Sequence, residues 1–435
     1  MDRQSPDEDW QQTEKSQQVL NQKHHRNPRQ WYRSRTRNIK VSFVYRTLIS
    51  VLLFCFSVTL ISGCGNQAST RSESPKGHAA TQGPTSTMMP ELTPPPAQIF
   101  TPAPHATTKP SPSQGNGTQP NGTQPNTLSA SQTVYYGVHV SLINMSLVSS
   151  FEANAHKPVA IVMWYQHWGE TDGYQYFQPA WMNAVRAHGS IPLLTWDPWD
   201  PTLGANQPTY ALQNIINGNF DSYIVKWAQA SKAWGHPYFL RFAHEMNGNW
   251  NPWSEPVNGN KAGQFVLAWR HVHAIFTAQG LTNVTWVWSP NIDFSSSMPL
   301  RELYPGDSYV DWVAMDGYNW GNIGAWHTWD SFSALFQQTY NEMLAITSKP
   351  MMIGEMASTE QDGNKAAWIS DAYTSQIPHN FSRIRAVIWF DQDKETDWRI
   401  ESSSTAQNAF ATAIQSGMYT SNWYASLNVS PIPVP

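Results

Sequence analysis

The sequence is poor in cysteine, and this excludes two kinds of chemistry for most of its length. Only two of the 435 residues are cysteines, Cys55 and Cys64, and both fall near the amino terminus. The rest of the chain therefore forms no disulfide and offers no thiol nucleophile. Its stability has to come from a hydrophobic core alone.

Excess charge of one sign is also missing. The formal net charge is −4 at pH 7, and the residues after Thr133 show no basic stripe or Arg-Gly tract of the kind that neutralises phosphates. We therefore expect no nucleic-acid partner. The chain also lacks a P-loop, a G-x-S-x-G nucleophile elbow and a dinucleotide-binding glycine motif after a strand, so no cofactor is implied.

The amino-terminal composition indicates export. Basic residues cluster in residues 1–46, and residues 47–64 follow as a mostly apolar run that ends in Ile61-Ser62-Gly63-Cys64. A basic flank before such a run is typical of an export signal or a signal anchor. The small residues before Cys64 match the pattern of bacterial lipoprotein processing. We expect either a lipid on Cys64 or an uncleaved anchor, and both place the remaining chain on the outer face of the membrane.

Composition changes twice more along the chain. Residues 65–132 are dominated by Pro, Ser, Thr, Gln, Gly and Asn, with NGTQP repeated in tandem at 116–125. So little apolar surface predicts a disordered linker. Apart from Trp10 and Trp31, all of the 22 tryptophans lie after it. We therefore predict one domain at residues 133–420, a C-terminal tail at 421–435, and a monomer.

Short apolar runs alternate with longer amphipathic stretches in this domain. Eight runs are predicted as strands, which begin at Tyr135, Val159, Ile191, Tyr238, Val284, Asp311, Pro350 and Arg385. Amphipathic stretches between them are predicted as helices, among them residues 180–189, 221–235, 264–280, 331–347 and 364–375. This α/β alternation predicts a (β/α)8 TIM barrel, in which the chemistry lies where the strands end.

Two glutamates follow predicted strands four and seven, each after an apolar approach. Glu245 and Glu355 would therefore face the same mouth of the barrel. Either residue alone is also compatible with an ordinary polar strand end. As a pair, however, two facing carboxylates are the minimum equipment for cleaving a glycosidic bond.

Aromatic and histidine residues complete the predicted mouth. Ten tryptophans fall at strand ends or in the following loops: Trp164, Trp168, Trp196, Trp199, Trp250, Trp253, Trp288, Trp320, Trp326 and Trp389. Because an indole face matches the C–H face of a sugar ring, this excess predicts a long sugar-binding cleft, although some of these residues must serve in packing. Trp196 and the strand-end His139 are included among the expected substrate contacts.

A metal site is the alternative use of the histidines. His139, His167 and His244 all end strands and could in principle hold a metal ion, but no supporting pattern accompanies them. His244-Glu245 does not begin a zinc-protease motif either, since Gly248 stands where the second histidine is needed. We predict no metal and assign these histidines to hydrogen bonds and sugar contacts.

The segment RFAHEMNGNWNPW, residues 241–253, resembles the acid/base signature of glycoside hydrolase family 26, and PMMIGEMAS, residues 350–358, resembles its nucleophile segment. The resemblance implies a retaining endo-β-glycosidase, with Glu245 as acid/base and Glu355 as nucleophile. It also implies site roles for several neighbours: His244 near the sugar, Tyr318 as a donor to the nucleophile, Trp250, Trp253 and Trp389 as sugar contacts, and Arg241 as a brace within the barrel. Glu245 should then be kept protonated by an apolar wall and by the charge of Glu355, which donors such as Tyr318 keep ionised.

The resemblance leaves the polysaccharide open. It implies an endo-β-1,4-mannanase first, with a mixed-linkage β-1,3-1,4-glucanase or a β-1,3-xylanase as alternatives, and the HEMNG form with Pro252 resembles the glucanase branch at least as well. An alternative of another class is a non-catalytic, cell-surface polysaccharide-binding domain. The intact pair of glutamates argues against it.

Overall fold

The computed structural model describes the carboxyl-terminal part of the chain. It covers residues 132–435 except 142–143, 171–172, 296, 324–326, 422–423 and 425–426. The expected signal or anchor segment, Cys64, the linker up to residue 131 and Trp326 lie outside the described residues. Within the part that is described, every helix is too short or too polar to span a lipid bilayer.

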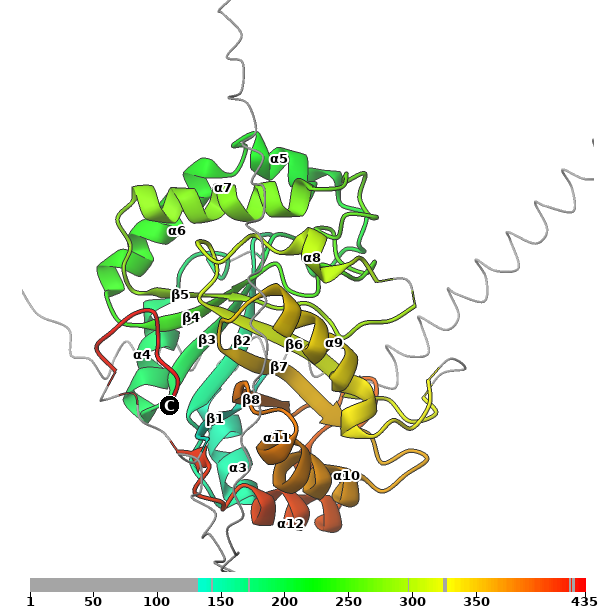
Figure 1. The fold of residues 1–435 in the computed structure, drawn as a ribbon. Coiled ribbons are helices and arrows are strands. Elements are labelled where there is room, and N and C mark those ends of the chain that lie inside the picture. The colour runs from blue at the N-terminus through cyan, green and yellow to red at the C-terminus, as the bar shows by residue number, and fades with distance from the viewer. Residues whose placement is uncertain are drawn as a thin grey trace, which may run out of the picture. The chain divides into compact units, whose positions relative to one another are not determined.

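Within residues 132–435, eight parallel strands close into a barrel (Figure 1). They are β1 (Val134–His139), β2 (Ile161–His167), β3 (Ile191–Asp197), β4 (Tyr238–Phe242), β5 (Val284–Trp288), β6 (Trp312–Asn319), β7 (Met351–Ser358) and β8 (Ile384–Phe390). Each strand pairs with the next, and β1 pairs with both β8 and β2, which closes the sheet. A short β9 (Tyr419–Thr420) adds to β1. The predicted (β/α)8 barrel is confirmed, and every predicted strand is present.

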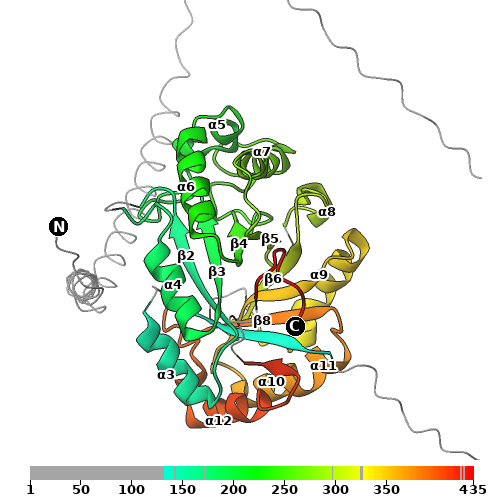
Figure 2. The ribbon, with the colours of Figure 1, turned by 90° about the vertical axis from the view of Figure 1, so that its left-hand side faces the viewer.

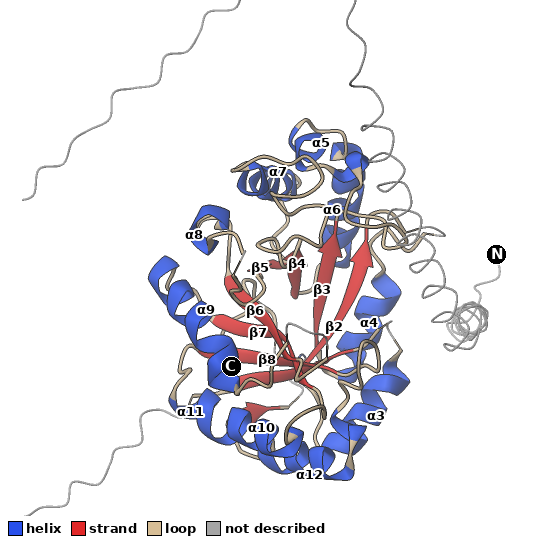
Figure 3. Ribbon diagram, turned by 90° about the vertical axis from the view of Figure 1, so that its right-hand side faces the viewer, coloured by secondary structure: helices blue, strands red, loops and turns tan. Residues whose placement is uncertain are grey.

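Helices surround the strands on the outside (Figure 3). They are α3 (Met145–Ala155), α4 (Pro179–His188), α5 (Leu212–Ile216), α6 (Asp221–Trp234), α7 (Gln264–Ala278), α8 (Leu300–Leu303), α9 (Phe332–Ile346), α10 (Lys365–Asp371), α11 (Ile377–His379) and α12 (Ser404–Ala413). Short helical turns are η1 (Pro208–Tyr210) after β3, η2 (Ala372–Gln376) between α10 and α11, and η3 (Ile400–Ser402) after β8. Of the predicted helices, 364–375 is divided, because α10 passes into the π-helical turn η2.

Local sequence explains where these helices begin and end. The Ser331 and Asn364 side chains accept hydrogen bonds from backbone amides of the first turns of α9 and α10, which satisfies donors that a helix leaves free. Gly189 and Gly235 end α4 and α6 with φ of +94° and +74°, a left-handed conformation that glycine adopts without steric cost.

The strands separate two hydrophobic cores. Alternate strand residues, such as Met163, Leu193 and Phe239, point into the barrel and pack together there. Their neighbours, such as Trp164, Leu194 and Leu240, belong to a larger core that includes the helices. Because strand side chains alternate in direction, a residue's parity along a strand decides whether it can reach the mouth.

The C-terminal segment covers the amino-terminal end of the barrel (Figure 2). Tyr424, Leu427 and Ile432 are buried within the barrel-interior core. The Ile432 carbonyl accepts from Trp312 Nε1 at 2.8 Å, and its amide donates to Thr285 Oγ1 at 2.8 Å. The described part of the predicted tail therefore packs as part of the domain.

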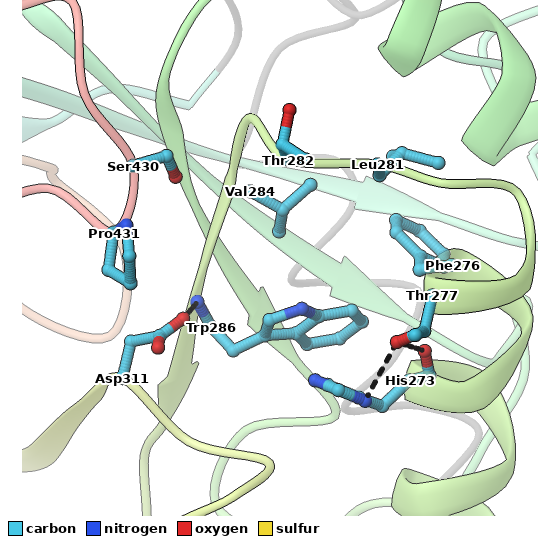
Figure 4. Close-up of a pocket in the computed structure, with 10 residues that line it drawn as sticks. All are labelled: His273, Phe276, Thr277, Leu281, Thr282, Val284, Trp286, Asp311, Ser430 and Pro431. Carbon is cyan, nitrogen blue, oxygen red and sulfur yellow. Dashed lines mark hydrogen bonds between the residues drawn. The ribbon is translucent and has the colours of Figure 1, made fainter.

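A cavity of about 270 Å³ lies beside the first residues of β5 (Figure 4). The end of α7 lines it with His273 and Phe276, and the C-terminal segment contributes Pro431. Asp311, on its wall, accepts from the Trp286 amide at 2.9 Å, and burial raises the pKa of its carboxyl. The cavity is at the opposite end of the strands from Glu245 and Glu355.

Candidate active site

A bulge in β7 delivers Glu355 to the mouth. Met315 of β6 pairs with Ile353, whereas the next residue, Asp316, pairs with Glu355, so Gly354 is an extra residue on β7. Such an insertion redirects the side chain that follows it. A Cβ at Gly354 would lie 2.5 Å from Asp316 Oδ1, and the bulge therefore requires glycine at this position.

Donors from three other strands surround the Glu355 carboxylate. Arg241 of β4 and Tyr165 of β2 both donate to Oε1, and Tyr318 of β6 donates to Oε2. Burial alone would raise the pKa of Glu355. The charges of Arg241 and His244, together with the hydrogen bonds, outweigh burial and hold this pKa well below its usual range. Glu355 is therefore ionised at neutral pH, in the state that the sequence predicted.

Arg241 lies beneath this carboxylate and is 0% exposed. Its Nη1 donates to Asp316 Oδ2 and its Nε to Thr195 Oγ1, each at 2.8 Å. One guanidinium is thus shared by two buried carboxylates, Asp316 and Glu355. The prediction that Arg241 braces the site from within the barrel is consistent with this position, whereas its complete burial leaves no surface for a substrate contact.

The chain takes an unusual backbone path between β4 and the acid/base candidate. Ala243 and Glu245 have φ of +47° and +51°, a region that costs an L-residue roughly 1 kcal/mol or more and persists only where the surroundings enforce it. Here the Ala243 amide donates to the Trp196 carbonyl on β3, and the Glu245 amide donates to the Ser289 carbonyl after β5. Anchoring to both neighbouring strands turns His244 and Glu245 into the mouth.

The Glu245 carboxylate is half-buried and accepts two hydrogen bonds. Trp250 Nε1 donates to one oxygen and Asn291 Nδ2 to the other, each at 2.7 Å. Asn291 is itself held by paired hydrogen bonds with Asn247, both at 2.9 Å. A Cβ at Gly248 would lie 2.6 Å from the Trp250 ring, so this glycine allows the indole to fold back toward Glu245. The structure thus places two polar donors against Glu245, where the sequence predicted an apolar wall.

The charges of both glutamates reach Tyr318. After burial, the negative charge of Glu355 is the strongest influence that raises the pKa of the Tyr318 hydroxyl, and the charge of Glu245 adds to it. Tyr318 thus donates to one carboxylate and lies within the electrostatic reach of the other. A buried, ionised carboxylate beside a half-exposed one is an arrangement that can attack a sugar carbon and exchange a proton with the leaving oxygen.

His244 carries a positive charge beside this pair. Its Nδ1 lies 3.1 Å from Asp197 Oδ1. Burial would lower the pKa of His244, but the charge of Asp197 outweighs burial and raises that pKa to about 9. The His244 carbonyl accepts from Trp253 Nε1 at 2.6 Å. Trp253 is fully buried, so it holds the loop that carries Glu245 and presents no face to a sugar.

Comparison with known proteins identifies the family to which this domain belongs. The family model described as glycosyl hydrolase family 26 matches residues 148–394. The chain belongs to this family. The resemblance found in the sequence is thereby confirmed, and membership places the protein among the glycoside hydrolases.

Proteins similar to this chain are named for different activities. Endoglucanase H of Acetivibrio thermocellus is 40% identical over 278 residues, which is 62% of this chain and 29% of that protein. A mannan endo-1,4-beta-mannosidase of Bacillus subtilis is 33% identical over 154 residues, or 33% of this chain and 36% of that protein. The chain thus spans 29% of the length of the first relative and 36% of the length of the second. The structure of a Bacillus subtilis mannanase matches with a TM-score of 0.51 at 19% identity, over 70% of this chain and 92% of that one, and shows the shared fold.

Two tryptophans predicted as substrate contacts in this family 26 domain face the helices. Trp196 packs on Trp227 with ring centroids 4.5 Å apart and donates to the Tyr223 hydroxyl at 3.2 Å. Trp389 packs on Phe410 at 5.4 Å and donates to the Trp398 carbonyl at 3.1 Å. Both are fully buried. The structure corrects these two predictions. Each tryptophan stands near a strand end, but the alternation of side chains along its strand directs it outward, toward the helices.

His139 points inward but has no free nitrogen. Its Nδ1 lies 3.2 Å from the Met163 carbonyl, and its Nε2 lies 2.8 Å from Gln392 Nε2. Burial lowers the pKa of His139 to about 3, so the ring is neutral, donates to the carbonyl and accepts from the amide. It supports the wall of the mouth and leaves no polar atom for a sugar.

The other tryptophans that the sequence placed near the mouth differ in exposure. Trp164, Trp168 and Trp288 are buried, Trp199 and Trp320 are half-buried, and Trp250 is 40% exposed.

Among the described residues, no group of three His, Cys, Asp or Glu side chains is placed to hold a metal ion. His167 lies 3.0 Å from Glu170, and His244 pairs with Asp197.

The sequence analysis did not identify two aromatic residues that support the site: Tyr165, which donates to Glu355, and the buried Trp398, which packs behind Tyr318. Tyr165 stands two positions from both Met163 and His167, so the alternation of β2 could have assigned it to the barrel interior. Trp398 follows β8 in a loop with no strand period, and no local signal identifies it. Its ring lies 5.2 Å from Tyr318 and 4.9 Å from Trp320 between centroids.

Proposed function

We propose that this family 26 protein is a retaining endo-β-glycanase, with Glu355 as nucleophile and Glu245 as general acid/base. The observation that carries the proposal is the Glu355 carboxylate, which is buried and ionised among Arg241, Tyr165 and Tyr318. A residue that forms an ester with a sugar must be ionised before attack, and a purely binding surface has no need of such a carboxylate.

The reaction that follows has two displacements. Glu355 attacks the anomeric carbon while Glu245 gives its proton to the departing glycosidic oxygen, which leaves a glycosyl ester on Glu355. Glu245, now ionised, then takes a proton from water as the water oxygen attacks the same carbon and the ester bond breaks. The two inversions restore the original configuration, and both carboxyl groups regain their starting states.

We propose a β-glucan as the first substrate and a β-1,4-mannan as the second. The endoglucanase relative is 40% identical over 278 residues, or 62% of this chain, whereas the mannosidase relative is 33% identical over 154 residues, or 33% of this chain. The longer and closer likeness favours glucan over the mannan that the sequence placed first.

The test is the release of reducing sugar from barley mixed-linkage β-glucan, mannan and β-1,3-xylan by the purified protein. We expect the highest kcat/KM on β-glucan and retention of anomeric configuration by NMR of the first products. If kcat/KM is instead highest on mannan, β-1,4-mannan is the preferred substrate. Binding without product from any of the three would favour the non-catalytic alternative.

We further propose that the protein is exported as a monomer and tethered at its amino terminus to the outer face of the membrane. Support comes from the basic residues before the apolar run 47–64 and from the small residues before Cys64. Mass spectrometry of the protein from membranes should find an acylated Cys64 at the amino terminus. A protein that keeps Met1 would indicate the uncleaved anchor, and recovery from the cytosol would refute export.

A further inference from the structure

The two oxygens of the Glu355 carboxylate have unequal surroundings. Oε1 accepts hydrogen bonds from both Arg241 Nη2 and the Tyr165 hydroxyl, whereas the Tyr318 hydroxyl is the one donor to Oε2 among the residues that the structure describes. A carboxylate oxygen has two lone-pair directions in its plane. Both directions are occupied at Oε1, and one remains free at Oε2.

Tyr165 is held firmly in this position. Its ring lies edge-on to the His139 ring with centroids 4.8 Å apart, and the Arg241 guanidinium lies 5.7 Å from the Tyr165 ring centroid. The His244 ring centroid is 5.5 Å from that of Tyr165. Burial and the charge of Glu355 raise the pKa of the Tyr165 hydroxyl well above its usual range, so it stays protonated and always donates.

Resting on the proposed function, we propose that Tyr165 is a positioning residue that acts together with Arg241. The two donors occupy Oε1 of Glu355, and Oε2, which faces Tyr318, is thereby the oxygen that bonds to the anomeric carbon. In the first displacement a lone pair of Oε2 forms the C–O bond, and the glycosidic bond breaks. Its electron pair goes to the leaving oxygen, which takes the proton of Glu245.

Tyr165 also affects the ester in the second displacement. When the bond to Oε2 breaks, the negative charge returns to the carboxylate, and the hydrogen bonds from Tyr165 and Arg241 to Oε1 stabilise it there. Hydrogen bonds to a charged group are among the stronger ones in proteins. Loss of the Tyr165 donor should therefore slow the second displacement, because the departing carboxylate is stabilised less. It should slow the first displacement because Oε2 is no longer held toward the anomeric carbon, and it should leave substrate binding nearly unchanged.

The first test is Tyr165→Phe in the full chain, with Tyr135→Phe as the matched control. Tyr135 is a buried tyrosine of the same barrel whose hydroxyl donates to the Pro433 carbonyl at 3.2 Å, at the opposite end. We expect kcat to fall about 10- to 100-fold in Tyr165→Phe with KM nearly unchanged. The acidic limb of kcat/KM should move to higher pH, because removal of a donor from the ionised carboxylate raises the pKa of Glu355.

Tyr135→Phe should leave the acidic limb where it is in the wild type, even if its stability falls. An unmoved acidic limb and unchanged kcat in Tyr165→Phe would overturn the positioning role. A shift of the limb that is equal in both variants would overturn it as well, because it would then reflect general loosening of the barrel.

The second test identifies the attacking oxygen. A 2-deoxy-2-fluoro glycoside with a reactive leaving group, built on the preferred sugar, should trap the glycosyl ester for crystallography. We expect the ester oxygen on the side of Tyr318, with the remaining carbonyl oxygen still bonded to Arg241 and Tyr165. An ester through the oxygen that faces Arg241 would overturn this inference alone. An ester on a residue other than Glu355 would overturn the proposed function and this inference with it.

Discussion

Glu355→Ala is expected to lower kcat on the preferred polysaccharide by about 10⁴-fold or more, because the sugar can no longer form its ester. The fold should survive the change. Arg241 keeps Asp316 as a partner at 2.8 Å, so removal of one of its two carboxylates leaves a neutral buried pair. Circular dichroism and thermal unfolding of the variant should therefore remain close to the wild type.

Added azide distinguishes loss of a nucleophile from loss of any other residue. In Glu355→Ala, azide can enter the vacated space and attack the anomeric carbon of a substrate with a good leaving group. The product should be a glycosyl azide with inverted configuration. Glu302→Ala, on the exposed face of α8, is the matched control and should behave as wild type. Substantial hydrolysis by Glu355→Ala without azide would refute its assignment.

Glu245→Ala should affect substrates unequally. On polysaccharide, whose leaving oxygen needs a proton, we expect kcat/KM to fall roughly 10²- to 10⁴-fold. On an aryl glycoside whose leaving group is an acidic phenol, formation of the ester needs no proton. The loss of kcat/KM on this substrate should therefore be small. The ester should accumulate as a burst of phenol, since water attack lacks its base.

Rescue of Glu245→Ala by azide should give the opposite stereochemistry from that of Glu355→Ala. Azide needs no general base and attacks the ester formed on Glu355, so the glycosyl azide should retain the starting configuration. Equal losses on polysaccharide and aryl glycoside would contradict the acid/base role. The same Glu302→Ala variant serves as the control for nonspecific effects of a lost carboxylate.

The barrel could be predicted because its signal is local and repeated. Each strand is a short apolar run, each of the longer helices carries an apolar face, and caps such as Ser331 and glycines such as Gly189 mark boundaries that depend only on nearby residues. Glu245 and Glu355 could be located for the same reason, since each directly follows or lies within such a run. Burial of the C-terminal segment had no comparable signal, because Ile432 gains its partners from strands more than a hundred residues away.

Predictions about the site failed where the direction of a side chain, or a contact between residues far apart in the sequence, decided the outcome. Trp196 and Trp389 stand near strand ends but point outward, which follows from the side-chain alternation once the strand register is known. Trp398 became part of the site only because its loop places the ring against Tyr318, and no period describes that loop.

By itself the sequence determined the succession of strands and helices, the family, and which two glutamates carry the proposed chemistry, because these depend on residue type and short spacing. Only the tertiary structure showed which neighbours keep Glu355 ionised. Gly354 creates the bulge that turns Glu355 inward, and Arg241, Tyr165 and Tyr318 reach it from three other strands. Charge and hydrogen bonding act through space, so the protonation state of a carboxylate depends on neighbours that lie far from it along the chain.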